Sequence, residues 1–299
     1  SVLTSNINSV TGLNVCCSSI TNLSGIDGFT SLMILNCSAN SLTSLNLSQN
    51  TALVELYCTS NQLGQLNIGQ NASLEILECF INPISSVDVS QNVALIELRC
   101  GSTNISSLDV SQNSALEILN YGNSPLSSLN VTQNLLLSEL SCGTTPITQV
   151  DVSQNSVLKY LSIDCSSLTS LDASQNSMLE VVSLTPNTDL ICVNLKNGNN
   201  TNITMFTAMN CPNLTCIEVD DIAWSNANWT GPFLGIDPQT SFSTYCGNSC
   251  SVGIDELISG PKELIKIMDI TGRKTSYVSK KLLFYLYSDG SVEKIFSIE

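Results

Sequence analysis

Apolar residues recur along most of the chain with a fixed period. In each unit they follow the order Leu-x-x-Leu-x-Cys and then Leu-x-x-Leu-x-Val, with Ile in some Leu positions, as in the stretch from Leu95 through Cys100 to Val110. The leading leucine returns every 21 residues, at Leu53, Leu74, Leu95, Leu116, Leu137, Leu158 and Leu179. A fixed repeat of this length predicts a solenoid, in which each unit packs only against its neighbours.

The first half of each unit predicts a short β-strand. Residues alternate between the two faces of a strand, so the leucine and cysteine positions point into the coil and the residues between them point outward. Strands of successive units then stack in parallel at about 4.8 Å. The second half returns the chain in extended or turn structure, which leaves little room for helix.

Asparagine ends each half-unit. One buried amide side chain offers two donors and two acceptor lone pairs to backbone groups that a turn leaves unpaired. We therefore expect two structural asparagine ladders along the array. One contains Asn40, Asn61 and Asn82, and the other contains Asn50, Asn71, Asn92, Asn113, Asn134, Asn155 and Asn176.

Departures from the repeat divide the chain into four parts. Residues 1–19 match the repeat poorly and are expected to form an N-terminal cap, whereas residues 20–187 contain about eight units of 21 residues. Residues 188–250 hold irregular repeats and a C-terminal cap with Cys and Trp. Residues 251–299 predict a small β tail with strands at 263–269, 282–287 and 291–297, the last two joined by a turn that favours a hairpin.

The units resemble the leucine-rich repeat family, in particular its nested 21-residue bacterial type. The signature Leu-x-x-Leu-x-Leu-x-x-Asn-x-Leu appears from Leu53 to Leu63 and, with Ile in the last position, from Leu74 to Ile84. The resemblance implies a mainly β, right-handed coil with one parallel concave sheet, little helix and a non-enzymatic role in recognition. Cysteine replaces leucine at one inward position, at Cys37, Cys58, Cys79, Cys100 and Cys142.

The outward strand positions define a candidate ligand-binding patch on the concave face. Glu alternates with apolar residues in one column, from Glu55 through Glu97 to Glu139, so like charges fall on alternate units. In the next column Glu78 stacks beside Arg99. Aromatic and charged groups together favour binding, and a merely solvated face is the alternative. The predicted contact residues are Glu55, Tyr57, Glu78, Phe80, Glu97, Arg99 and Tyr160.

The C-terminal segments resemble parts of secreted bacterial repeat proteins. The tail that contains Cys216 and Cys246 resembles those that follow such arrays, and the resemblance pairs these two cysteines. Cys192 and Cys211 are further disulfide candidates, because they lie off the period. Residues 251–299 resemble the sorting domain of the type IX secretion system, which implies contact with that machinery and a secreted or bacterial cell-surface location. The matching positions are Asp269, Gly272, Arg273, Gly290 and Lys294.

Composition argues against several function classes. A formal charge of −15 repels nucleic acid and anionic lipid. No apolar run reaches the roughly 20 residues that span a bilayer, and the start at Ser1 without a signal-like segment is expected of a mature or trimmed product. The chain has no His, which removes His-based catalysis and His-ligated metals. We expect no enzyme activity, no cofactor and no metal.

Two columns leave alternatives open. The cysteine column is expected to be a reduced core ladder, and a metal or redox array is the alternative. A second column, before the turn of the second half-unit, is expected to be a solvated or capping row, and a Ca²⁺ ladder is its alternative. That column contains Asp88, Asp109, Asp151 and Asp172.

Taken together, the sequence predicts a secreted or cell-surface binding or adhesion protein on a leucine-rich repeat scaffold, with a protein or glycan ligand on its concave face. A structural protomer that assembles with copies of itself into a filament or surface layer is the alternative. Open solenoid ends offer edges for such contacts.

Overall fold

The structure is a computed structural model that describes residues 7–164, 167–230, 235–247 and 250, together with the strands at 264–268, 282–287 and 292–296. Its contacts divide the chain into two units, Ser1–Val252 and Gly253–Glu299.

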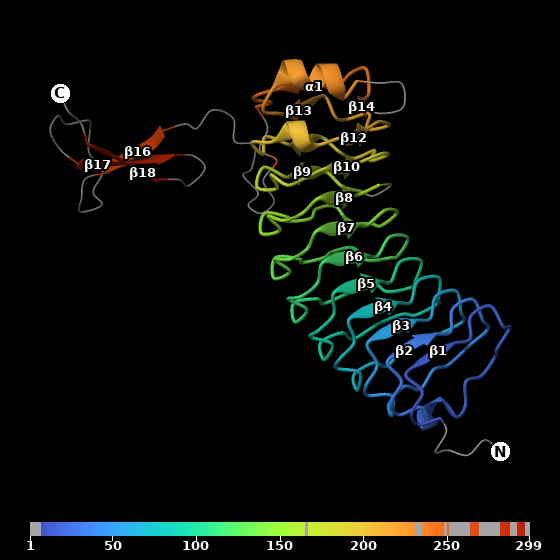
Figure 1. Ribbon diagram of the computed structural model, residues 1–299. Helices are drawn as coiled ribbons and strands as arrows, with labels where there is room; N and C mark the ends of the chain where they lie inside the picture. The colour runs from blue at the N-terminus through green and yellow to red at the C-terminus, as the bar shows by residue number, and fades with distance from the viewer. Residues whose placement is uncertain are drawn as a thin grey trace. The chain divides into compact units, whose positions relative to one another are not determined.

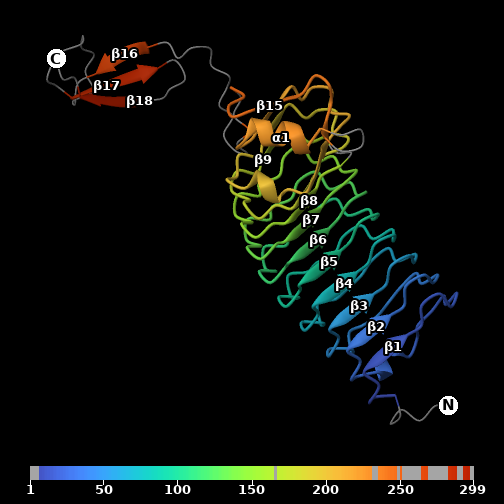
Figure 2. The ribbon, with the colours of Figure 1, turned by 45° about the horizontal axis from the view of Figure 1, so that its top comes forward.

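The first unit is a β-solenoid built on a parallel sheet of eleven strands (Figures 1 and 2). Each strand is one rung, and the register pairs a residue with its counterpart in the next unit, for example Leu56 with Leu77. The predicted leucine-rich repeat solenoid with a parallel concave sheet is thereby confirmed. In order, the strands are β1 (Gly12–Asn14), β2 (Ile34–Asn36), β3 (Glu55–Tyr57), β4 (Ile76–Glu78), β5 (Glu97–Arg99), β6 (Ile118–Asn120), β7 (Glu139–Ser141), β8 (Tyr160–Ser162), β10 (Val181–Ser183), β12 (Met205–Ala208) and β14 (Gly235–Ile236).

Helix is scarce in the part of the chain that the structure describes. One α-helix, α1 (Ile222–Asn228), and two single 3-10 turns, η2 (Ile26–Gly28) and η3 (Asn200–Asn202), are found there. None of these is long and apolar enough to cross a membrane.

Columns of leucine and cysteine form the core. Leu53, Leu56 and Cys58 of one rung are each 0% exposed, and their counterparts along the array are buried in the same way. Full burial of a leucine side chain stabilises a fold by roughly 1.5–3 kcal/mol, and here each side chain packs between the rungs on either side. Tyr121 and Ile163 fill the cysteine column where cysteine is absent.

Asparagine side chains tie neighbouring coils together at the end of the second half-units. Nδ2 of Asn113 donates to the carbonyl oxygens of Val89 (3.1 Å) and Asn92 (2.8 Å), and the residue is 0% exposed. Asn92 makes the same pair of bonds one coil earlier, with Ile68 (3.1 Å) and Asn71 (2.8 Å). Each amide therefore adds a second donor to carbonyl oxygens of the preceding coil, which also accept backbone hydrogen bonds within their own turn.

The ladder at the end of the first half-units changes its chemistry along the array. Nδ2 of Asn61 donates to the carbonyl oxygens of Cys37 and Cys58, both at 3.0 Å, and so bridges two rungs. Beyond Asn82 a hydroxyl takes over, as at Thr103, whose Oγ1 donates to the Cys100 carbonyl of its own rung (2.8 Å). Ser124 and Thr145 follow the same pattern.

A second parallel sheet of four strands is formed by second half-units and the segment that follows them. It lies on the C-terminal coils and has the order β15-β13-β11-β9. Its strands are β9 (Ser170–Asp172), β11 (Cys192–Asn194), β13 (Cys216–Glu218) and β15 (Ser241–Ser243).

Aromatic side chains cover the core at these last coils. The Trp229 ring is 2% exposed and its centroid lies 4.7 Å from that of Phe206 and 5.7 Å from that of Phe242. Its Nε1 donates to the Ile203 carbonyl (3.1 Å), so the only polar atom of the ring is satisfied. Trp224 meets Trp229 edge-on at 5.4 Å.

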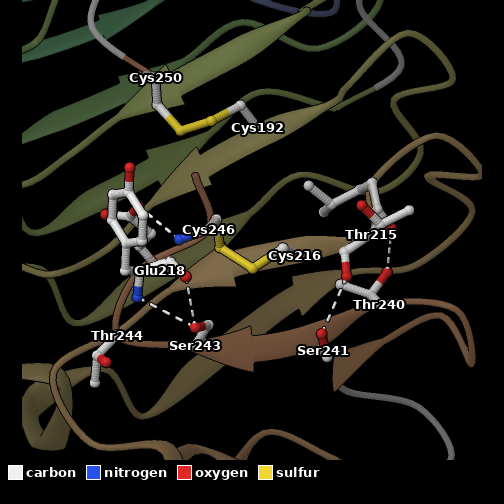
Figure 3. The surroundings of a disulfide bond; sticks show 12 residues. Cys192, Thr215, Cys216, Glu218, Thr240, Ser241, Ser243, Thr244, Cys246 and Cys250 are labelled. Carbon is white, nitrogen blue, oxygen red and sulfur yellow. Dashed lines mark hydrogen bonds between the residues drawn. A yellow bond between two sulfur atoms is a disulfide. The ribbon is translucent and has the colours of Figure 1, made fainter. Parts of the chain in front are cut away.

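Two disulfides join the second sheet to the segment that follows it (Figure 3). The bond between Cys216 and Cys246 confirms the predicted pairing. Cys192 is bonded to Cys250, and Cys211 is free, so the expectation of a disulfide at Cys211 is wrong. Cys211 is 0% exposed, and its thiol donates to the Leu184 carbonyl (3.5 Å); it is a core residue despite its irregular spacing.

The second unit contains a three-stranded antiparallel sheet, β16 (Leu264–Met268), β17 (Leu282–Tyr287) and β18 (Val292–Phe296). The three strands coincide with those expected from the sequence to within a residue at each end, and β17 pairs antiparallel with β18 as a hairpin requires. Lys294 lies on β18. The other positions of the sorting-domain resemblance, Asp269, Gly272, Arg273 and Gly290, lie outside the described residues.

Replacing Asn113 tests the ladder. Asn113→Ala should lower the free energy of unfolding by about 1–3 kcal/mol, because the two buried hydrogen bonds to the Val89 and Asn92 carbonyls are lost. Asn113→Asp should cost more, because a carboxylate oxygen would face the same two carbonyl oxygens. Urea denaturation followed by circular dichroism measures both. The exposed neighbour Gln112→Ala is the control, with an expected change within about 0.5 kcal/mol; equal effects at 112 and 113 would refute the ladder.

Candidate functional site

The outward residues of β3 to β7 form the centre of the candidate site on the concave face. The register places Glu97 between Ile76 and Ile118, so carboxylates of this column are separated by an aliphatic rung. In the next column Arg99 lies between Glu78 and Asn120. In-register stacking therefore brings residues that are 21 positions apart in sequence onto one continuous surface.

Arg99 is the cation around which the charges of this surface gather. Its guanidinium pairs with Glu97 on its own strand, with Glu78 on β4 (Nε to Oε1, 3.8 Å) and with Glu139 on β7 (Nη1 to Oε1, 3.9 Å). The side chains of Arg99 and Glu78 are 29% and 26% exposed. Ion pairs of this exposure contribute little to stability, but the network holds the Arg99 side chain in place across several rungs.

Tyr57 marks the N-terminal side of the same patch. Its hydroxyl donates to Oε2 of Glu55 (2.9 Å). Burial, this hydrogen bond and the charges of Glu55, Glu78 and Glu97 raise the pKa of Tyr57 to about 12. Burial and the Glu97 carboxylate also raise the pKa of Glu78, against the opposing effect of Arg99. Burial is the largest cause of both pKa shifts, and neighbouring carboxylates add to each.

A hollow of about 170 Å³ opens beside Arg99 and is lined by Phe80, Arg99, Gly101, Ser102 and Asn120. Glycine is needed on its floor, because a Cβ at Gly101 would lie 2.7 Å from the Gly122 carbonyl oxygen. The hollow thus combines an aromatic side, a guanidinium and an amide, which suits a ligand group with both apolar and polar parts.

The structure brings most of the predicted contact residues together, but not all of them. Tyr160 is 47% exposed on β8 and neighbours Glu139 and Val181 in register, so it lies at the edge of the group around Arg99, three rungs from β5. Glu139 was not among the predicted contact residues and yet pairs with Arg99. Its place in the Glu column was visible in the sequence, but the reach of an arginine over two rungs was not.

A larger hollow of about 350 Å³ lies near the N-terminal coils, lined by residues 22–27 and 44–46. Asp27 is the only charged residue in its lining. We place the candidate site at Arg99, where aromatic and charged groups converge, and not in the larger hollow.

The contacts of the cysteine and aspartate columns are those of core packing and turn capping. Within the described residues, no three Cys, Asp or Glu side chains converge as a metal site would require. Oδ1 of Asp88 accepts a hydrogen bond from the Ser90 backbone N–H (2.9 Å), and that interaction with Ser90 lowers the pKa of Asp88. Asp109 does the same with Ser111. These aspartates cap their own turns.

Comparisons with known proteins identify the fold. No family model and no curated protein sequence matches the chain. An internalin (inlF) from Listeria monocytogenes has a TM-score of 0.62 at 16% identity, covering 83% of this chain and 90% of that one. Internalin C2 from the same species has a TM-score of 0.58 at 21% identity, covering 62% of this chain and 84% of that one. At these identities the likeness shows the leucine-rich repeat fold alone.

A third structure is the functional domain of InlJ from Listeria monocytogenes, which is described as including a cysteine ladder. It is 26% identical to this chain with a TM-score of 0.45, over 80% of this chain. This chain spans 63% of that domain's length, which is less than two thirds.

Thiol labelling tests the buried cysteine column. Burial raises the pKa of Cys37, Cys100 and Cys142 to about 12, so at pH 8 only about one such thiol in ten thousand is ionised. Iodoacetamide at pH 8 should therefore leave these thiols unmodified in the folded protein and alkylate the exposed Cys17. Peptide mass mapping reads out each position, and labelling in denaturant is the control. Rapid native labelling of Cys100 would contradict a closed core.

Proposed function

We propose that the chain is a non-enzymatic binding protein that recognises a partner protein on its concave face, at the patch formed by Tyr57, Phe80 and Arg99 with the surrounding carboxylates. The observation that carries the proposal is the Arg99 network, in which one guanidinium is held by carboxylates from three strands beside an aromatic-lined hollow. Aromatic side chains are enriched among the residues that dominate the energetics of protein interfaces, and the ion pairs of Arg99 hold the carboxylates beside them in place.

The fold supports a binding role because its sheet face is continuous, exposed and rigidly backed by a core. Side chains on such a face are positioned by the strand register, and their identities change freely without disturbing the inward leucines. The internalins show that the same scaffold is used by bacterial proteins.

We infer further that the protein works outside the cytoplasm, secreted or on the bacterial surface. Two disulfides, Cys192–Cys250 and Cys216–Cys246, support this location because such bonds persist in oxidising compartments. The resemblance of residues 251–299 to a type IX sorting domain supports export by that route. A glycan ligand remains an outcome of the experiment below.

An array of proteins and glycans probed with wild-type and variant protein tests the proposed patch. The double variant Tyr57→Ala, Phe80→Ala should lose at least about tenfold in affinity for its hits, because both aromatic anchors are removed. Tyr245→Ala is the matched control, since Tyr245 is 76% exposed and belongs to the C-terminal segment, away from β3 to β7. Equal signals from the wild type and the double variant would reject the patch.

A further inference from the structure

Carboxylates and aliphatic side chains alternate along two neighbouring columns of the sheet face. The column within the strands runs Glu55, Ile76, Glu97, Ile118 and Glu139 in register. The residues directly before the strands form a column in the opposite phase, linked by backbone hydrogen bonds, which runs Val54, Glu75, Ile96, Glu117 and Ser138. Every rung from β3 to β7 thus carries one carboxylate in these two columns. We call this surface, together with Glu78 and Arg99, the acidic checkerboard.

The charges of the acidic checkerboard are not balanced from within. It contains six glutamates and one arginine. Arg99 pairs with Glu78, Glu97 and Glu139, which leaves three glutamates without a cation. Of these, Glu55 accepts a hydrogen bond from Tyr57, whereas Glu75 and Glu117 are exposed. No cation of the described residues pairs with these three carboxylates.

Arg99 shows how this surface receives a cation. Its guanidinium lies between carboxylates from β4, β5 and β7, and the side chain is only 29% exposed. The stem of the side chain runs along a face whose other members include aliphatic residues, and long cationic side chains commonly pack in this way with their charge directed to an acceptor. Glu55, Glu75 and Glu117 offer the same acceptor chemistry to a cation from outside.

We propose that the acidic checkerboard binds a cationic amphipathic helix of a partner protein; this inference rests on the proposed function and specifies the chemistry of its partner. Strands of a sheet lie about 4.8 Å apart, close to the roughly 5–6 Å between Cβ atoms three or four residues apart on a helix. A helix lying across the strands therefore presents one Lys or Arg to each rung. The isoleucines between the carboxylates contact the apolar face of the helix, which is how amphipathic helices are commonly recognised.

A labelled synthetic helix of Lys and Leu in amphipathic order is the probe, and fluorescence anisotropy measures its affinity. The variant Glu55→Gln, Glu75→Gln, Glu117→Gln should weaken binding on the order of tenfold, because three acceptors lose their charge without changing size. Arg99→Gln should strengthen binding, because it releases Glu78, Glu97 and Glu139 to the probe. Salt should weaken binding to the wild type.

The matched control is Asp88→Asn, Asp109→Asn, Asp151→Asn, which makes the same change of net charge in the turns of the second half-units, where Asn46, Asn67 and Asn130 already occupy the same column. It should bind the probe like the wild type. The inference is overturned if this control weakens binding as much as the glutamate variant, if a shuffled peptide of the same composition binds as tightly, if Arg99→Gln weakens binding, or if the probe does not bind.

The two proposals fail separately. If the array partner is neutral or acidic and its binding is lost in the Tyr57→Ala, Phe80→Ala variant, the proposed function stands and the inference of a cationic partner is overturned. The aromatic patch would be rejected, and the acidic checkerboard preserved, by a different pair of results. In that case the Tyr57→Ala, Phe80→Ala variant gives the same array signals as the wild type, while the glutamate variant binds the helical probe more weakly.

Discussion

The asparagine amide at the end of each second half-unit must reach carbonyl groups of the preceding coil, and this constraint favours a constant 21-residue period. Asn113 satisfies it by donating to the carbonyl groups of Val89 and Asn92. An inserted or deleted residue would move the amide away from both acceptors and break these two buried hydrogen bonds. The exact repetition of asparagine therefore keeps the leucine columns in register, and through them the outward columns on which binding depends.

The architecture could be predicted because period and polarity are both visible in one sequence. Leucines at a fixed spacing identify the inward positions, and the same counting places the outward residues in columns. The period predicts less where a residue of another type, or one at an irregular spacing, takes the same structural role. Thr103 replaces asparagine with a hydroxyl that bonds only within its rung, and Cys211 is buried although its spacing suggested a cap disulfide. The first strand, Gly12–Asn14, lies in a segment that matches the repeat poorly. It still joins the sheet, because its three backbone pairings with β2 need no consensus side chains.

The candidate site was predictable to the extent that backbone register determines it. Glu78 and Arg99 are 21 residues apart, so the repeat predicts that they are neighbours on adjacent strands, and the register of β4 and β5 pairs them. Side-chain reach does not follow from counting: Arg99 also pairs with Glu139, two strands away. Nor does counting reveal the hollow beside Phe80, which depends on the absence of a side chain at Gly101. Tyr160 shares the face, but it lies on β8, with β6 and β7 between it and β5.

A repeat protein that places the same residue in every rung stacks like charges at about 4.8 Å, and alternation of charged with uncharged residues relieves that repulsion. Relief alone does not explain the residues chosen here. Lysine or threonine between the glutamates would relieve the repulsion and remain well solvated, yet isoleucine occupies those positions in both columns, at Ile76, Ile96 and Ile118. A partly exposed isoleucine is not stabilised by hydration as threonine or lysine would be, and it cannot form an ion pair with the neighbouring carboxylates. A surface that gives up both kinds of stabilisation on successive rungs is better suited to contact with a partner than to solvent alone.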